Sequence, residues 1–438
     1  MKKTFKLLNN LDKNAIAIYH GRKIFKEEFL SHVELTKNHL LLRKYAINLC
    51  ENRYHFLVTF AACATLGQIS LFPSSKAKKE IERLSESYFN SYLINDEDVI
   101  DLYQQNNKNE CKKTKNFDIS AQQTVAILFT SGTTGEAKKN PKTWGQLNES
   151  AIRVGKRLWP KGVQGKCIIA TVPPQHMFGF ETSIIYPLTL GIMMHDGYPF
   201  YPLDIQQIAL ETPEPKILIA TPLHLKACIG LRENWHNIDA VISATSLLSN
   251  DIANEAEKIL NTHVFEMYGC SESGAIATRQ INKGDKWELL EDYDIKANKN
   301  NILLKAVGYK NLITISDQIK MIDDRFFYLL GRNSDLVKIG GKRESLSGLS
   351  YKLKKIDGVD DGIFFIPKED TNKRVRLAAL AVSSTLTRDQ IIPLLSQTID
   401  SVFLPRPLKV VASLPYNKLG KLPFNNLIKM IDGASLDI

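Results

Sequence analysis

A run of glycine and hydroxyl residues directly follows an apolar segment and has the composition of a phosphate-binding loop. The run spans Thr130 to Lys138, and the apolar segment spans Thr124 to Phe129. Glycine allows a sharp turn that brings backbone N–H groups close to phosphate oxygens. Hydroxyl groups and a lysine add further donors and a positive charge. Because the G-x-x-x-x-G-K-[ST] spacing is absent, the run predicts a triphosphate loop of another type. The candidate contacts are Thr130, Ser131, Gly132, Thr133, Thr134, Gly135 and Lys138.

Further motifs follow along the chain, and together with the loop they form a specific series. They are Tyr268-Gly269-Cys270-Ser271-Glu272, Ile315-Ser316-Asp317, Gly331-Arg332 and Gly420-Lys421. This series resembles the adenylate-forming superfamily of acyl- and aryl-CoA synthetases, luciferases and peptide-synthetase adenylation domains. The resemblance extends from about Ala15 to Leu427. It implies that ATP and Mg²⁺ are used to convert a carboxylic acid into an acyl-AMP, which a phosphopantetheine thiol then attacks.

Two charged residues have the central catalytic roles that the resemblance implies. Glu272 is the expected magnesium ligand, since a carboxylate is a hard oxygen donor suited to an ion that also binds phosphates. Lys421 is the expected catalytic cation, because an ammonium can bridge the carboxylate and the α-phosphate as charge builds in the transition state. Its flanking residues differ from the usual Thr-x-Ser-Gly-Lys, but Gly420-Lys421 is kept.

The resemblance also assigns residues to the nucleotide. Tyr268 corresponds to the aromatic residue that stacks on adenine, and Ser271 keeps a hydroxyl for the α-phosphate. A carboxylate can accept from two vicinal hydroxyls, so Asp317 is expected at the ribose. Arg332 is expected at ribose or phosphate. The remaining nucleotide candidates are Gly269, and Ser243 and Thr245 in a segment, Ser243-Ala244-Thr245-Ser246, that lacks the two glycines usual there.

The segment from Pro174 to Glu181 resembles the wall of the acid pocket. His176 resembles the aromatic or histidine gate residue of the family and is therefore also a catalytic candidate, whereas a lone histidine is more often a buried structural residue. Gly179, Phe180 and Glu181 follow it and are expected to shape the pocket. Amino-acid adenylases place an aspartate here for the substrate amine. Only Glu181 is acidic, so an aryl or acyl acid is favoured and an amino acid stays an alternative.

Apolar runs that alternate with helical segments predict an α/β fold. Runs such as Thr124–Phe129, Lys216–Ala220 and Val264–Met267 are continuous and rich in β-branched residues, as in sheets covered on both faces. We expect a large multi-layer N-terminal domain of stacked sheets and helices over residues 1–333. A small mobile α+β domain should follow over residues 334–438 and carry Lys421. Ser334 occupies the position of the family's hinge.

Composition restricts the class of protein. The chain has 438 residues, 44% hydrophobic and 24% charged, which is ordinary for a globular protein. Its net charge of +10 is dispersed, so we do not expect nucleic-acid binding. The N-terminus lacks the apolar core of a signal peptide, and the longest apolar run is too short to span a bilayer. The six cysteines lack metal-site spacing and are expected to be reduced. A cytoplasmic location follows as an expectation.

In local sequence the chain most resembles stand-alone ligases of aryl-polyene and xanthomonadin clusters, which load a hydroxybenzoate-type acid onto an acyl carrier protein. This resemblance rests on Val337–Arg343 and Asn417–Pro423. The acceptor is therefore expected to be an acyl carrier protein, with free CoA as the alternative. A non-catalytic nucleotide-binding regulator is a second alternative, disfavoured by the presence of Lys138, Glu272, Asp317, Arg332 and Lys421 together.

Overall fold

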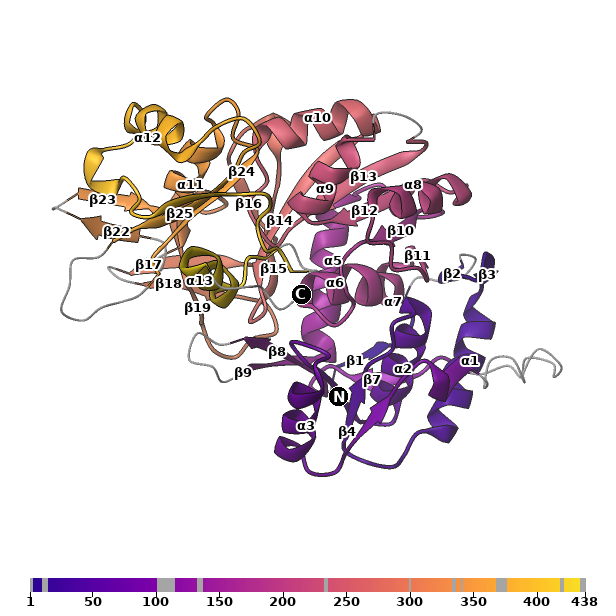
Figure 1. Ribbon diagram of the computed structural model, residues 1–438. Coiled ribbons are helices and arrows are strands. Elements are labelled where there is room, and N and C mark those ends of the chain that lie inside the picture. Colours follow the sequence, from indigo (N-terminus) through magenta and orange to yellow (C-terminus); the bar gives the residue numbers. More distant parts are fainter. Residues whose placement is uncertain are drawn as a thin grey trace. The chain divides into compact units, whose positions relative to one another are not determined.

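The chain forms two compact units in the computed structural model (Figure 1). The first unit contains residues 1–295 and 304–313, and the second contains residues 296–303 and 314–438. The structure describes residues 3–9, 15–100, 115–131, 137–231, 235–298, 301–332, 336–339, 342–367, 376–417 and 421–433. Each unit is described separately below.

A long, mainly parallel sheet dominates the first unit. Within the unit its strand order is β16-β15-β14-β13-β12-β10-β11-β2-β3. The inner strands from β14 to β2 are parallel, and β15, β16 and β3 are antiparallel additions at the two ends. The strands are β2 (Ala17–Tyr19), β3 (Arg22–Ile24), β10 (Cys167–Ala170), β11 (Met193–His195), β12 (Lys216–Ala220), β13 (Ile238–Ser243), β14 (His263–Cys270), β15 (Gly274–Gln280) and β16 (Trp287–Leu289).

A second sheet in the same unit carries the predicted phosphate loop. Its order is β6-β4-β5-β8-β9, parallel except for the antiparallel pair β8–β9. A two-stranded antiparallel sheet, β1–β7, completes this part of the chain. The strands are β1 (Thr4–Lys6), β4 (Tyr45–Asn48), β5 (Ile69–Phe72), β6 (Ser91–Ile94), β7 (Asp118–Ser120), β8 (Thr124–Ser131) and β9 (Ala137–Thr143).

Helices cover and separate these sheets, as the layered α/β prediction requires. They are α1 (Lys26–His39), α2 (Arg53–Thr65), α3 (Lys78–Ser87), α5 (Trp144–Leu158), α6 (Met177–Phe180), η1 (Glu181–Ile185), α7 (Tyr186–Leu190), α8 (Pro202–Glu211), α9 (Pro222–Ile229), α10 (Asn250–Leu260) and η2 (Ile281–Lys283). Helix α5 contacts both β9 and β15 and so packs against both large sheets. A capping box at Thr143 starts this helix directly after β9.

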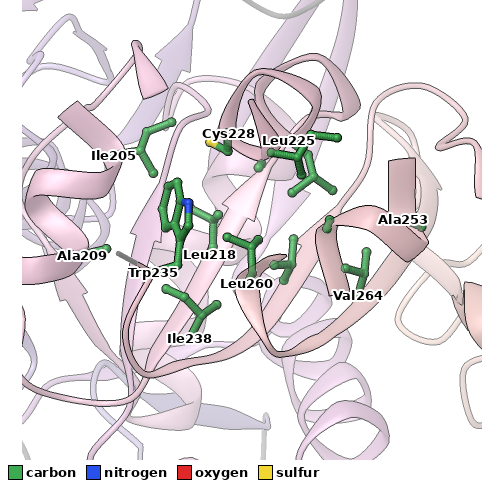
Figure 2. Packing of buried hydrophobic residues seen from close by; sticks show 14 of the residues in the cluster. Ile205, Ala209, Leu218, Leu225, Cys228, Trp235, Ile238, Ala253, Leu260 and Val264 are labelled. Carbon is green, nitrogen blue, oxygen red and sulfur yellow. The ribbon is translucent and has the colours of Figure 1, made fainter. Parts of the chain in front are cut away.

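Buried side chains from α8, α9 and α10 and from the neighbouring strands form one apolar core of the first unit (Figure 2). Trp235 and Leu218 lie at its centre in the figure, with Ile205, Leu225 and Leu260 around them. Burial of such side chains stabilises by about 1.5–3 kcal/mol each. The carboxyl ends of the parallel strands are therefore held on a rigid layer, and in open α/β sheets ligands bind at those ends.

The second unit is a smaller α+β assembly with its own core. It contains the antiparallel hairpins β20–β21 and β22–β23 and a three-stranded sheet, β24-β25-β26. The division between units falls within the sheet β17-β18-β19. The elements are β17 (Asp294–Asn298), β18 (Asn301–Lys305), β19 (Ile313–Ile315), β20 (Asp317–Met321), β21 (Phe326–Arg332), β22 (Leu336–Ile339), β23 (Lys342–Ser345), α11 (Leu346–Lys354), β24 (Asp361–Phe365), β25 (Ala378–Val382), α12 (Arg388–Ser396), η4 (Ser401–Phe403), β26 (Leu408–Val411) and α13 (Phe424–Asp432).

The fold class predicted from the sequence is confirmed, while the domain boundary stays a prediction. The predicted boundary falls between residues 333 and 334, in a stretch outside the described residues. The two compact units instead divide the chain first after residue 295 and finally after residue 313. Cys50, Cys63, Cys167 and Cys228 are buried free thiols, as expected, and Cys270 is free and half-buried. Among the helices of the described ranges, none combines the length and apolarity needed to cross a membrane.

Candidate active site

Strands β8 and β9 form an antiparallel hairpin whose connection is the predicted phosphate loop. Thr130 lies opposite Lys138 in the hairpin register. The Asn140 side chain donates to the Thr130 hydroxyl oxygen over 3.4 Å, which ties the two strands together beside the loop. The connecting residues Gly132, Thr133, Thr134 and Gly135 lie outside the described residues, and their contacts with phosphate stay predictions.

Lys138 and Glu272, predicted separately from two motifs, meet in the structure. The Lys138 ammonium donates to Oε1 of Glu272. The lysine side chain is 61% exposed and the glutamate side chain 31% exposed. Burial alone would raise the pKa of Glu272, but the hydrogen bond and charge of Lys138 outweigh it and lower this pKa below its usual value. The carboxylate is therefore ionised at neutral pH, as a metal ligand must be.

The turn that carries Glu272 joins β14 to β15 and depends on two glycines. A Cβ atom at Gly269 would lie 2.2 Å from the Gly274 carbonyl oxygen, so the two strands could not close the turn with any larger residue. Gly274 has a φ of +76°, a conformation that glycine adopts readily. The Tyr-Gly-x-Ser-Glu motif thus has a backbone reason for its glycine as well as a chemical reason for its acid.

Three side chains that the sequence did not identify as a group contact the inner side of this turn; two are buried and one, Tyr309, is half-buried. Lys142, on β9, donates to the Glu272 carbonyl oxygen and to the Tyr309 hydroxyl. Tyr309 donates to the Ser273 carbonyl oxygen over 3.1 Å. Glu181 accepts from the Ala275 amide over 3.1 Å. The lysine-rich segment of β9 is typical of solvated surface, so its composition does not indicate that Lys142 is only 1% exposed.

The nucleotide candidates of the first unit lie at strand ends. Tyr268 packs against Trp287 with ring centroids 5.6 Å apart. Ser271 follows β14 directly in the turn of Glu272. Ser243 ends β13, and its buried hydroxyl has no hydrogen-bond partner among the described residues. Thr245 has a φ of +84°, a left-handed conformation that is unusual for a β-branched residue and that a glycine would adopt without strain.

The residues predicted for the acid pocket lie around the start of α6. His176 is half-buried and precedes that helix. A Cβ atom at Gly179 would lie 2.1 Å from the Pro173 carbonyl oxygen, which explains the glycine. Phe180 is fully buried against Phe60 and Phe72. Contact of these residues with an acid stays a prediction.

Glu181 is almost completely buried and has several protein partners. Besides the Ala275 amide, it accepts from the Ser150 hydroxyl over 2.8 Å. Burial raises its pKa to about 7, and these hydrogen bonds and the charge of Lys142 act in the opposite direction. Glu181 is thus held in the protein interior, and its predicted place in the acid pocket stays a prediction.

A buried arginine that was not a candidate in the sequence anchors both ends of the segment that contains His176. Arg53 is completely buried, and its guanidinium donates to the Ala170 and Val172 carbonyl oxygens over 2.9 and 3.0 Å. It also donates to the Ser183 hydroxyl over 2.5 Å. It therefore holds the end of β10 against η1, on either side of the segment that contains His176.

The second unit carries the other nucleotide candidates and the candidate catalytic lysine. Asp317 and Arg332 are direct partners across the β20–β21 hairpin. Lys421 is exposed and closes a turn with Asn417, through backbone and side-chain hydrogen bonds of 2.8 and 2.9 Å. Ser334 lies outside the described residues, so its role as a hinge stays a prediction.

Comparison with known proteins determines the family. The AMP-binding enzyme family matches residues 45–297, more than half of the chain. This chain belongs to that family. A 4-coumarate–CoA ligase from Halorhodospira halophila is 25% identical over 313 residues, covering 69% of this chain and 76% of the relative. A 3,4-dihydroxybenzoate–[aryl-carrier protein] ligase from Bacillus anthracis is 22% identical over 321 residues, covering 69% and 73%.

Solved structures share the fold over nearly the whole chain. O-succinylbenzoate coenzyme A synthetase from Bacillus subtilis, in complex with AMP, has a TM-score of 0.80 at 17% identity and covers 95% of this chain and 96% of its own. ATP-bound MatB from Rhodopseudomonas palustris has a TM-score of 0.78 at 18% identity, with 97% and 96% covered. The AMP-binding protein described here is an adenylate-forming acid ligase that uses ATP.

The donor set fits a magnesium ion that arrives with the nucleotide. Within the described part of the chain, no three His, Cys, Asp or Glu side chains gather as an all-protein metal cage. Mg²⁺ usually keeps several waters and binds through one or two carboxylates plus substrate phosphates. The half-buried carboxylate of Glu272, ionised and next to the predicted phosphate loop, matches that pattern.

Proposed function

We propose that this enzyme activates an aryl or acyl carboxylic acid as its acyl-AMP and transfers it to a phosphopantetheine thiol of an acyl carrier protein. The observation that carries the proposal is the contact between Lys138 of the loop strand and Glu272 of the Tyr-Gly-x-Ser-Glu turn. A triphosphate site needs a cation for the phosphates and a carboxylate for their metal ion next to each other. Two motifs that are far apart in sequence supply that pair.

Each residue has one role in the proposed reaction. A substrate carboxylate oxygen attacks the α-phosphorus of ATP, the bond to the β-phosphate oxygen breaks, and pyrophosphate leaves. Lys421 bridges the two anions, Asp317 holds the ribose hydroxyls, and Lys138 screens the phosphates. Glu272 would hold Mg²⁺, which would supply further charge neutralisation. In the second step the thiol sulfur attacks the acyl carbon and releases its proton to water, the bond from the acyl carbon to the phosphate oxygen breaks, and AMP leaves.

The protein partners of Glu181 favour an acid without an α-amine. An amino-acid adenylase needs an unpaired carboxylate for the substrate ammonium. Glu181 already accepts from the Ser150 hydroxyl and the Ala275 amide. Its charge is also balanced by the buried Lys142. The amino-acid alternative would require this arrangement to open.

The choice of acceptor rests mainly on charge. Relatives of both kinds are known, a CoA ligase and an aryl-carrier protein ligase. The net charge of +10 suits an acidic carrier protein. In the cluster Lys352–Lys355, however, Lys352 pairs with Glu344 and Lys354 with Asp361. A second basic run in this unit, Lys373–Arg376, lies outside the described residues except for Arg376.

A pyrophosphate-release screen tests the first step. Purified enzyme would be offered ATP, Mg²⁺ and a panel of aryl, fatty and amino acids. Aryl or fatty acids should release pyrophosphate, and Glu272→Gln should weaken the Mg²⁺ dependence while leaving ATP binding largely intact. Release with amino acids alone would support the amino-acid adenylase, and no release with any acid would support the regulator.

A salt series tests the acceptor. Holo-carrier protein and free CoA would be supplied side by side with the same acid at increasing ionic strength. Association with a carrier protein should slow steeply, because the Debye length falls to about 8 Å at physiological salt. A CoA catalytic efficiency equal to or above that of every holo-carrier tried would refute the carrier proposal.

A further inference from the structure

Three side chains, of which Lys142 and Glu181 are buried and Tyr309 is half-buried, hold successive parts of the turn that presents Glu272. Lys142 binds the carbonyl of Glu272, Tyr309 binds the carbonyl of Ser273, and Glu181 binds the amide of Ala275. They come from β9, from the segment 304–313 and from η1, which are distant in sequence. All belong to the first unit. We call Lys142, Tyr309 and Glu181 the turn brace.

Strand β9 connects this brace to the phosphate loop. Side chains alternate along a strand, so residues 138, 140 and 142 share one face. Asn140 and Lys142 are buried, whereas Lys139 and Pro141 are exposed. The two lysines on this face reach the same residue: the exposed Lys138 contacts the carboxylate of Glu272, and the buried Lys142 contacts its backbone carbonyl. Strand β9 therefore restrains the positions of both the side chain and the main chain of Glu272.

The burial of two opposite charges shows that the brace carries an energetic cost. Buried lysine and glutamate are rare unless they are paired, because each loses its hydration. Burial lowers the pKa of Lys142 to about 8 and raises that of Glu181 to about 7, and each charge favours the ionised form of the other. If these two positions served only for apolar packing, Leu and Met would fill them without the desolvation cost of two buried charges.

The turn itself is shaped around the brace. Gly274 lies between the residues that Tyr309 and Glu181 contact, and a Cβ atom there would lie 2.6 Å from Oε1 of Glu181. Lys142 also lies over the Tyr309 ring, 5.2 Å from its centroid. The backbone of the turn thus has little freedom to move inward, and the hydrogen bonds restrain it from moving outward.

We propose that Lys142, Tyr309 and Glu181 are positioning residues that fix the Glu272 carboxylate where the metal ion and the phosphates meet. The proposal deepens the proposed function and rests on it. Residues that orient a metal ligand without touching the metal commonly change metal affinity about 10- to 100-fold when they are removed. The brace should act in the same way through the backbone of Glu272.

The test compares Lys142→Met with Lys139→Met, the same change on the exposed face of the same strand. For each variant, acyl-AMP formation would be titrated with Mg²⁺, and hydrogen exchange would be measured for the peptide covering residues 270–275. Lys142→Met should raise the Mg²⁺ concentration for half-maximal rate about tenfold or more with an unchanged KM for the acid. The turn amides should exchange faster. Lys139→Met should match wild type in both measurements.

Second variants keep the proposal testable if Lys142→Met does not fold. Tyr309→Phe removes one hydroxyl and should shift the Mg²⁺ titration in the same direction. Lys142→Arg keeps the charge and should restore much of the metal response, which a loss of packing alone would not predict. Because both residues belong to the turn brace, the effect of the double variant Lys142→Met/Tyr309→Phe on the Mg²⁺ titration should be smaller than the sum of the two single effects.

The outcomes separate the brace from the proposed function. Wild-type Mg²⁺ titration and wild-type exchange in folded Lys142→Met or Tyr309→Phe would overturn the brace while acid activation stands. If the wild-type enzyme activates no acid, the proposed function fails. The exchange rates of residues 270–275 and Mg²⁺-dependent ATP binding by calorimetry, compared with Lys139→Met, then decide the brace independently.

Discussion

Replacing Lys138 by Met separates the catalytic value of the Lys138–Glu272 contact from its structural value. The lysine is mostly exposed and the glutamate about one-third exposed. An ion pair of this exposure contributes only about 0.2–1 kcal/mol to the free energy of unfolding. Because the ion pair is weak, it can open when the nucleotide binds, so that Lys138 contacts the phosphates and Glu272 the metal ion. Lys138→Met should therefore lower the melting temperature by no more than about 4 °C.

The effect on catalysis should be far larger. Loss of one fixed charge at an anionic transition state costs on the order of 10²–10³ in rate. Without Lys138 the pKa of Glu272 should rise, because the hydrogen bond from Lys138 and the charge of Lys138 lower that pKa in the wild type. The acidic limb of the pH–rate profile should then move to higher pH. In the wild type, the stability from this pair is present above the unfolded-state pKa of Glu272 and is lost as the pH falls through the folded-state pKa.

The assay follows pyrophosphate release against pH and Mg²⁺ concentration, with thermal unfolding recorded on the same samples and Lys139→Met as the control. A folded Lys138→Met enzyme with a wild-type rate would refute the assignment of Lys138 to the phosphates. A rate loss that is matched by loss of folded protein would refute the separation of catalysis from stability.

Three further outcomes are expected. Lys421→Ala should slow acyl-AMP formation on the order of 10²–10³-fold, yet it should still form thioester from supplied acyl-AMP; equal loss in both half-reactions would argue against a bridging role. Ser334→Pro should leave adenylation intact and impair thioester formation, because proline fixes φ; unchanged transfer would place the hinge elsewhere. Thr245→Gly should raise the free energy of unfolding by about 0.5–1 kcal/mol in denaturant titration, since the left-handed φ of +84° is strained for threonine. A decrease would mean that contacts of the threonine side chain outweigh the strain.

Local sequence patterns predicted the strands well because most of them are buried on both faces. Lys216–Ala220 matches β12, and Thr124–Phe129 lies within β8. Lys138 and Glu272, which the resemblance assigns to one site, also lie in contact, although their roles stay predictions. These features depend on short stretches of chain, where composition and motif spacing carry the information.

The brace could not be predicted, because it depends on tertiary packing. Strand β9 contains three lysines and Pro141, which together favour a surface segment or an edge strand. Only the partners of Lys142, the Glu272 carbonyl and the Tyr309 hydroxyl, account for its burial. The strain at Thr245 was only partly foreseeable: the missing glycines were visible in the sequence, but the φ angle was not.

The discontinuous first unit limits how the ligase can be cut and recombined. Its chain leaves at residue 295 and returns for residues 304–313, and Tyr309 lies in the returning segment. A chimera joined after residue 295 would therefore give its host the Glu272 turn together with a foreign residue at the position of Tyr309. Swapping of acid-binding halves between relatives should tolerate a junction after residue 313 better than one after residue 295, because only the later junction transplants the turn with its own support.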